Sequence, residues 1–110
     1  MKPKTLAEIS KTLWETNVAK GWSKLDHRPL EHHALMISEI AEATEAVRNR
    51  EEPCWSDETG KAQGEAVELA DCVIRIMNYF TANGWDLTDV ILFKDKYNQS
   101  RSKLHGGKLK

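Results

Sequence analysis

The sequence predicts an all-α protein, a four-helix bundle-like fold that is completed by oligomerisation. Four segments place apolar residues at helical spacing, and no segment shows sustained strand alternation. Helix start and stop residues stand at the ends of these segments. The 110 residues suffice for one domain with a small core, and the expected third and fourth helices carry more apolar surface than such a core can bury. We therefore expect a single domain, residues 1–110, with residues 1–4 and 105–110 as flexible ends.

The first helix is expected over residues 6–20. Thr5 and Glu8 have the spacing of a capping box, in which each side chain accepts a hydrogen bond from the backbone of the other. Gly21 is a typical residue after a helix end, because glycine adopts a left-handed backbone without steric cost. The second helix is expected over residues 30–50, with a proline just before it and another beyond its end.

Residues 51–63 are polar and include a proline and a glycine, so we expect a connecting loop there. The third helix is expected over residues 64–83, followed by Gly84 as a stop residue. The fourth should begin after Asp86, which is a suitable N-cap, and run to residue 100.

The formal net charge of -1 conceals an asymmetry along the chain. Residues 1–93 carry 10 Lys and Arg against 16 Asp and Glu, whereas residues 94–110 carry 6 Lys and Arg against Asp95 alone. An acidic body with a basic ending is not the pattern of a general nucleic-acid binder, so we expect no stable nucleic-acid partner.

No apolar run approaches the length of a membrane span, and the first residues do not resemble a signal peptide. The two cysteines, Cys54 and Cys72, cannot form a disulfide scaffold, and the chain has no C-x-x-C zinc motif. These features predict a cytoplasmic protein with reduced thiols and no membrane partner.

Two pairs of carboxylates have the spacing of one helical turn. On a helical wheel, Glu39 falls in the middle of the apolar face of the second expected helix, with Glu42 at the edge of that face. Glu68 and Asp71 repeat the same spacing on the third helix. Four carboxylates converging between packed helices repel one another unless some are protonated or bind a cation. Oxygen-only ligands favour Mg²⁺, with Mn²⁺ as an alternative, over zinc or copper.

The carboxylates of each helix, taken alone, also have an explanation that involves no function. Glu39 can form a buried ion pair, or the helix can be shifted so that this side chain reaches solvent. Asp71 and Arg75 are spaced for an ordinary ion pair within one helix. A di-iron bundle is disfavoured because such sites use Glu-x-x-His, which this chain lacks.

The ordered set of motifs resembles the MazG-like, all-α nucleoside triphosphate pyrophosphohydrolases. The motif E-x-x-E at Glu39 and Glu42 is followed by E-x-x-D at Glu68 and Asp71. The ending then contains K-x-x-Y-N-x-x-R from Lys94 to Arg101, and HGGK from His105 to Lys108. The resemblance is to a short single-domain subgroup of bacteria and their phages and spans about residues 17–108.

This resemblance implies an α-helical homodimer, extended in some members to a homotetramer, and a nucleoside triphosphate substrate. It further implies Mg²⁺-dependent cleavage of an NTP or dNTP between the α- and β-phosphates, giving the monophosphate and pyrophosphate. Such an enzyme controls nucleotide pools or removes damaged nucleotides. The expected metal ligands are Glu39, Glu42, Glu68 and Asp71, and either Glu39 or Glu42 would accept the proton of the attacking water.

The basic ending and two residues near the first helix supply candidate substrate contacts. Lys94, Asn98 and Arg101 fall on one side of the fourth helix, which suits a row of phosphate contacts, and Lys108 follows a Gly-Gly pair that lets the backbone approach an anion. Asn17 and Trp22 are candidates for contact with the base. The alternative for the basic ending is a solvated C-terminus without a binding role. The alternative for Trp22 is packing in the core or in an oligomer interface.

Three other functions remain open at the level of sequence. One is a phosphoribosyl-ATP pyrophosphohydrolase, an enzyme with a related helical fold. The second is a non-catalytic helical oligomerisation module, in which the charged side chains are solvated and bind nothing. The third is nucleic-acid binding through the basic ending, which would give salt-sensitive affinity independent of Glu39.

Overall fold

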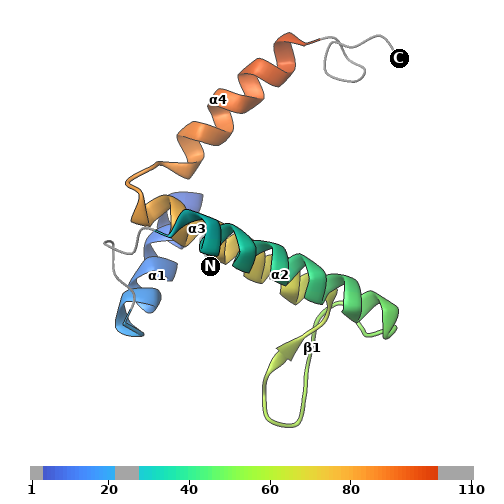
Figure 1. The fold of residues 1–110 in the computed structure, drawn as a ribbon. Helices are drawn as coiled ribbons and strands as arrows, with labels where there is room; N and C mark the ends of the chain where they lie inside the picture. Colours follow the sequence, from blue (N-terminus) through green and yellow to red (C-terminus); the bar gives the residue numbers. More distant parts are fainter. Residues whose placement is uncertain (1–3, 22–27, 102–110) are drawn as a thin grey trace.

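A computed structural model describes residues 4–21 and 28–101 of the 110-residue chain. Residues 1–3, 22–27 and 102–110 lie outside the described parts, and with them the predictions for Trp22 and Lys108. The elements in chain order are α1 (Leu6–Ala19), α2 (Pro29–Arg48), β1 (Trp55–Ser56), β2 (Ala62–Gln63), α3 (Glu65–Ala82) and α4 (Leu87–Ser100). The prediction of a largely α-helical protein with four helices is confirmed (Figure 1).

The helix boundaries follow from local sequence signals. Thr5 and Glu8 form the expected capping box, with the Glu8 amide donating to Thr5 Oγ1 at 3.1 Å and the Thr5 amide donating to Glu8 Oε1 at 2.9 Å. The Asp86 side chain likewise accepts a hydrogen bond from the Asp89 amide at the start of α4. Gly84, which follows α3, has a φ of 73°, the left-handed conformation expected at a helix end.

The connection between α2 and α3 is more ordered than the predicted loop. Its two short strands form an antiparallel hairpin in which Trp55 lies opposite Gln63 and Ser56 opposite Ala62. The Asp57 carboxylate closes the hairpin by accepting hydrogen bonds from the Thr59 amide, the Thr59 hydroxyl, the Lys61 amide and the Gln63 side chain. Two-residue strands are too short to show alternation in the sequence, so the pattern could not reveal them.

The packed part of the molecule is the pair α2 and α3, which run antiparallel and side by side, with α1 against α3 (Figure 1). The interior of this pair is small. Among the described residues, its buried hydrophobic members are Ala43, Ala46, Cys72 and Met77. The alanines let the two helices approach closely, and this approach brings the polar residues on their shared edge together.

α4 contributes little to that interior. Its first turn lies against α1 and the end of α3, and residues 90–100 are all exposed. In Figure 1 the helix extends away from the other three. The four helices therefore do not form a closed bundle within one chain.

Within the described residues, no helix combines the length and the apolar character needed to cross a membrane.

Candidate metal centre

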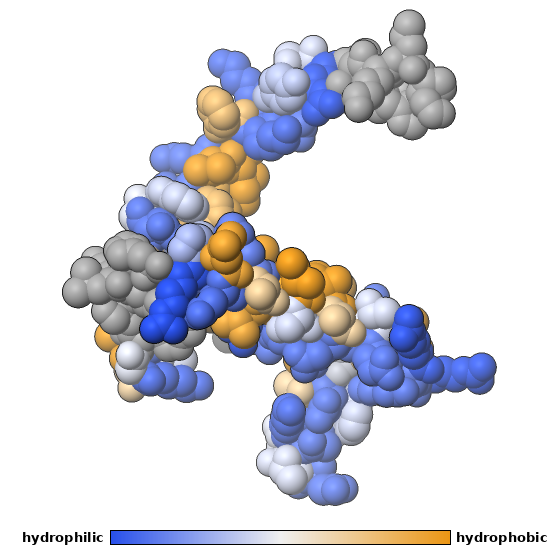
Figure 2. Space-filling model, in the orientation of Figure 1, coloured by the Kyte–Doolittle hydropathy of each residue, from blue (hydrophilic) through white to orange (hydrophobic). Residues whose placement is uncertain are grey.

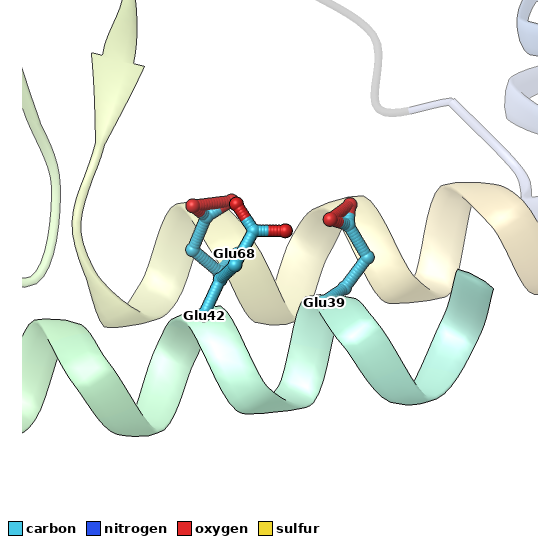
Figure 3. A group of neighbouring side chains, drawn as sticks. All are labelled: Glu39, Glu42 and Glu68. Atoms are coloured by element: carbon cyan, nitrogen blue, oxygen red, sulfur yellow. The ribbon is translucent and has the colours of Figure 1, made fainter. Parts of the chain in front are cut away.

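Three carboxylates from two helices converge on one edge of the α2–α3 pair. Glu39 and Glu42 are one turn apart on α2, and Glu68 lies in the first turn of α3. One carboxylate oxygen of each residue lies within 4.8 Å of the corresponding oxygens of the other two (Figure 3). Glu39 is only 5% exposed, whereas Glu42 remains open to solvent. The arrangement therefore combines a fixed buried carboxylate with an accessible one.

The spacing of these oxygens fits a small divalent cation. Mg²⁺ binds oxygen ligands at roughly 2.1 Å, so ligands on opposite sides of the ion are about 4.2 Å apart. A group that lies within 4.8 Å needs only a small inward movement to reach that geometry. The donors are carboxylate oxygens alone, as Mg²⁺ and Mn²⁺ prefer. Three protein ligands would leave positions for water and for phosphate oxygens.

Arg75 of α3 is the cationic partner of the buried carboxylate. Its Nε donates to Glu39 Oε2 at 3.5 Å, across the boundary between the two helices. The sequence suggested an ion pair of Arg75 with Asp71 within α3, but the pair found among the described residues joins Arg75 to Glu39. Burial of Glu39 is thereby partly compensated even without a metal ion.

Asp71, the fourth predicted ligand, is not part of the group of three. It lies beside Glu39, and desolvation, a hydrogen bond with Glu39 and the charge of Glu39 together raise the pKa of Asp71. Desolvation and the neighbouring charges of Glu39 and Asp71 likewise raise the pKa of Glu68. Both pKa shifts arise first from desolvation and then from the neighbouring acidic groups, and both causes favour binding of a proton or a cation.

A cavity of about 330 Å³ adjoins this cluster. Asp71 and Arg75 form part of its wall, and both also contact Glu39 of the cluster. Its lining is mixed polar and apolar: Asn17, Lys20, His32, Met36, Asp71, Ile74, Arg75, Asn78, Tyr79 and Ala82. The volume is at the lower end of the range of small-molecule sites. Asn17, predicted as a base contact, therefore lies in a cavity beside the candidate metal ligands.

Asn78 is a residue of this cavity wall that the sequence did not single out. Its Oδ1 atom is buried and has no hydrogen-bond partner among the described residues. Most buried polar atoms are hydrogen-bonded, and this unpaired acceptor beside the cavity can accept a hydrogen bond from a ligand bound there. Asn78 lies seven residues after Asp71, two turns along the same helix face, and this spacing is the signal that could have identified it.

A second hollow, of about 180 Å³, lies on the hairpin side of the cluster. Glu42 and Glu68 line it together with Glu51 and Gln63. Glu51 also accepts a hydrogen bond from the Trp55 indole at 3.2 Å, and Gln63 donates to Asp57. The connection between α2 and α3 thus brings two further polar residues close to the carboxylates, Glu51 just after α2 and Gln63 on β2.

The predicted phosphate-binding residues Lys94, Asn98 and Arg101 lie on α4 and directly after it, apart from the carboxylates of the same chain. Lys94 of α4 and Arg101, the residue that follows α4, both lie over the ring of Tyr97, at 4.8 and 5.1 Å from its centroid. Neither they nor Asn98 line the two hollows beside the cluster.

Searches against protein-family models, curated proteins and solved structures find no match to this chain. The chemistry of the site therefore has to support any functional assignment.

Proposed function

We propose that this protein is a Mg²⁺-dependent nucleoside triphosphate pyrophosphohydrolase, which cleaves an NTP or dNTP between the α- and β-phosphates. The observation that carries the proposal is the convergence of Glu39, Glu42 and Glu68 from two helices beside a nucleoside-sized cavity. The motif resemblance described above supports the same activity. The proposal extends to Mn²⁺ as an alternative ion, because both ions prefer oxygen ligands.

The carboxylates would hold the cation, with Asp71 completing the set after a side-chain movement. A divalent ion at this position withdraws charge from triphosphate oxygens and lowers the pKa of water. Glu42, the exposed member of the cluster, and Glu39, the buried member, are the two candidates to accept the proton of the attacking water. Arg75 holds Glu39 in place and leaves the open side of the cluster to the substrate.

The cavity beside the cluster would take the nucleoside. Met36, Ile74 and Ala82 provide apolar surface for a base or sugar, while Asn17 and Asn78 provide amide groups for a base edge. A nucleoside in this cavity would place its phosphates toward Asp71 and Arg75, because these residues form the boundary with the carboxylates.

A panel of NTPs, dNTPs and phosphoribosyl-ATP with Mg²⁺, analysed by ³¹P NMR, tests the proposed function. We expect the monophosphate and pyrophosphate as products and a loss of most activity in Glu39→Gln, which removes a ligand charge at nearly constant size. Glu65→Gln is the matched control, because Glu65 lies on α3 outside the cluster and both hollows. Release of orthophosphate with a nucleoside diphosphate would contradict the proposal. Turnover of phosphoribosyl-ATP alone would favour the related enzyme instead.

A non-catalytic helical oligomerisation module is the second candidate, and the large exposed apolar side chains favour it. That function gives no role to a buried glutamate at the convergence of two helices. An absence of turnover across the whole panel, together with an absence of specific Mg²⁺ binding, would favour the module.

A further inference from the structure

Arg75 contacts the carboxylate cluster and also lines the cavity beside it. Its Nε donates to Glu39 Oε2 at 3.5 Å, and its side chain forms part of the cavity wall. The Arg75 side chain is 37% exposed, so solvent and ligands can reach it, whereas that of Glu39 is 6% exposed. Among the residues that the structure describes, no other cation forms an ion pair with a member of the cluster. Arg75 is therefore the cationic side chain that belongs to both the cluster and the cavity.

Most of the hydrogen-bonding capacity of Arg75 is unused. A guanidinium group has five N–H donors, and the contact with Glu39 engages only the one on Nε. The Nη atoms, which carry the other donors, form no hydrogen bond to any described residue. The fork of donors on a guanidinium matches the geometry of a carboxylate or a phosphate. An anion in the cavity can therefore bind the Nη atoms while Nε stays beside Glu39.

The charges of the cavity wall favour an anion close to Arg75. Lys20, at the end of α1, is a second cation of this wall, and it forms no ion pair with the cluster among the described residues. Asp71 lies one turn before Arg75 on the same wall and would repel an anion. The charge of Arg75 offsets that repulsion. A ligand anion is therefore favoured beside the Nη atoms of Arg75, with Lys20 as a further cation of the wall.

The other side of the cluster offers no comparable cation. The hollow on the hairpin side is lined by Glu42, Glu45, Glu51 and Glu68, and by no lysine or arginine among the described residues. Figure 2 shows the hairpin and the adjoining end of α2 as a hydrophilic surface. A ligand anion would meet carboxylates there, which repel it. The cavity that contains Arg75 is therefore the side from which an anion can approach the cluster.

The charge of Arg75 opposes the binding of a cation to the cluster. Its Nε lies 3.5 Å from Glu39 Oε2, so it offsets part of the negative charge that attracts a divalent ion. An anion on the Nη atoms would neutralise the guanidinium and restore that attraction. Coupling between two bound species is reciprocal, so the cation must increase the affinity for the anion by the same factor.

We propose that Arg75 couples the two parts of the site: an anionic ligand in the cavity binds its Nη atoms, and the affinity of Glu39, Glu42 and Glu68 for a divalent cation increases as a result. Without such a ligand, Arg75 keeps the cation affinity low. Arg75 is a positioning residue, because it acts on the cation through Glu39. The identification of the anion as a nucleotide phosphate rests on the proposed function, whereas the coupling rests on the ion pair and the cavity wall.

Calorimetric titration of Mg²⁺ with and without a nucleotide tests the coupling in the wild type. The probes are 2′-deoxynucleoside 5′-monophosphates, which the proposed reaction does not consume. A saturating monophosphate should lower the Kd for Mg²⁺ by roughly 10-fold, a common strength of coupling between two sites. The matching nucleosides, which lack the anion, should leave the Kd unchanged. An unchanged Kd with every monophosphate would overturn the inference.

Arg75→Met and Lys20→Met form a matched pair of variants for the same titration. Arg75→Met should bind Mg²⁺ more tightly than the wild type in the absence of a ligand, and a monophosphate should no longer change that affinity. Lys20→Met removes the same charge from the same cavity wall but not from the cluster. It should weaken monophosphate binding and preserve the ratio of the two Kd values for Mg²⁺.

Two results with these variants would overturn the role of Arg75. Coupling that persists in Arg75→Met would show that the cation contacts the phosphate directly. Equal loss of coupling in Arg75→Met and Lys20→Met would show that any cation of the cavity wall has the same effect.

The Arg75 side chain can also be observed in the wild type, so the inference does not depend on a destabilised variant. In ¹⁵N-labelled protein the Nε–Hε resonances of arginine side chains are resolved from the backbone amides. A monophosphate added without metal should shift the Arg75 resonance, and the matching nucleoside should not. The Arg48 resonance is the internal control, because Arg48 pairs with Glu45 and does not line the cavity. No shift of Arg75, or an equal shift of Arg48, would overturn the inference.

Failure of this inference is distinguishable from failure of the proposed function. Coupled binding of Mg²⁺ and a monophosphate through Arg75, without turnover of any triphosphate, would support the coupling and contradict the function. Release of pyrophosphate by a wild type whose Mg²⁺ affinity does not respond to monophosphates would support the function and overturn the coupling. A wild type that binds no Mg²⁺ would overturn both.

Discussion

Arg75 Nε donates to Glu39 Oε2 at 3.5 Å, and this contact joins α3 to the buried carboxylate of α2. The Glu39 side chain is 6% exposed, whereas that of Arg75 is 37% exposed. The buried Glu39 carboxylate thus has one partly solvated cation beside it and three neighbouring carboxylates, those of Glu42, Glu68 and Asp71. A second positive charge, that of a divalent ion, would balance this group better than Arg75 does alone.

Replacing Arg75 by Met should destabilise the metal-free protein. The substitution leaves the buried Glu39 carboxylate without its cation, at an expected cost of about 1–3 kcal/mol once the partial exposure of Arg75 is taken into account. Glu39→Gln should not cause a comparable loss, because it removes a charge from an acidic cluster. Urea unfolding without divalent ions measures both. An equally unstable Glu39→Gln variant would indicate that Glu39 serves folding and not cation binding.

The stability of the metal-free protein should depend on pH through Glu68 and Asp71. Their folded pKa values are raised above the ordinary 4.5 and 3.8, so the folded state holds protons more tightly than the unfolded state. The ionised carboxylates of Glu68 and Asp71 therefore lower the free energy of unfolding at any pH above their folded pKa values. This destabilisation is lost as the pH falls from the folded pKa values to the ordinary pKa values. Stability should therefore increase with falling pH in that window, and Glu68→Gln with Asp71→Asn should flatten the curve.

At lower pH, Asp57 of the hairpin gives the free energy of unfolding the opposite dependence on pH. Hydrogen bonds from Thr59, Gln63 and Lys61 lower the pKa of Asp57 to about 2, so its contribution is lost as the pH falls from 3.8 through that value. Thermal melting between pH 2 and 7 at low ionic strength should show a maximum between the two effects. A monotonic rise of stability with pH across the Glu68 and Asp71 window would contradict the crowding of carboxylates.

The sequence predicted the helices well because each carries its own boundary signals. The cap of α1 joins Thr5 to Glu8, and the cap of α4 joins Asp86 to Asp89. Each pair is three residues apart, so these helix starts can be recognised without knowledge of long-range packing. The helical periodicity also placed Glu39 on the buried side of α2, and the structure confirms its burial.

Features that depend on packing between segments were not predictable in the same way. The pairing of Arg75 with Glu39 requires the register of α3 against α2, which a wheel for one helix does not contain. The hairpin that brings Gln63 to the cluster depends on side-chain hydrogen bonds to Asp57. Asn78 was missed because its importance lies in the cavity it faces.

Gly64 should be required for the arrangement of the hairpin and the start of α3. Its φ is 113°, and a Cβ atom there would overlap the backbone oxygens of Glu52 and Pro53. Gly64→Ala should therefore destabilise the protein by more than about 1 kcal/mol. Gly60→Ala is the matched control, since Gly60 also has a positive φ of 87° but has no atom within 4 Å of the added group. If both variants lost equal stability in urea, the close approach would have no energetic role.

Asn78→Leu should separate substrate binding from stability. The substitution removes an acceptor that is buried without a partner, so the free energy of unfolding should be unchanged or higher. If the cavity binds the nucleoside, KM should increase by roughly 10-fold, the value of one lost hydrogen bond of about 1.4 kcal/mol. Steady-state kinetics with urea unfolding checks both parts. An unchanged KM would place the nucleoside elsewhere.

The central claim is that the cluster of Glu39, Glu42 and Glu68 binds a divalent cation. Calorimetric titration of Mg²⁺, repeated with Mn²⁺, tests it most directly. The wild type and Glu65→Gln should show the same saturable binding, whereas Glu39→Gln and Glu68→Gln should each lose most of it. No saturable binding by the wild type, or equal binding by all four proteins, would contradict the claim.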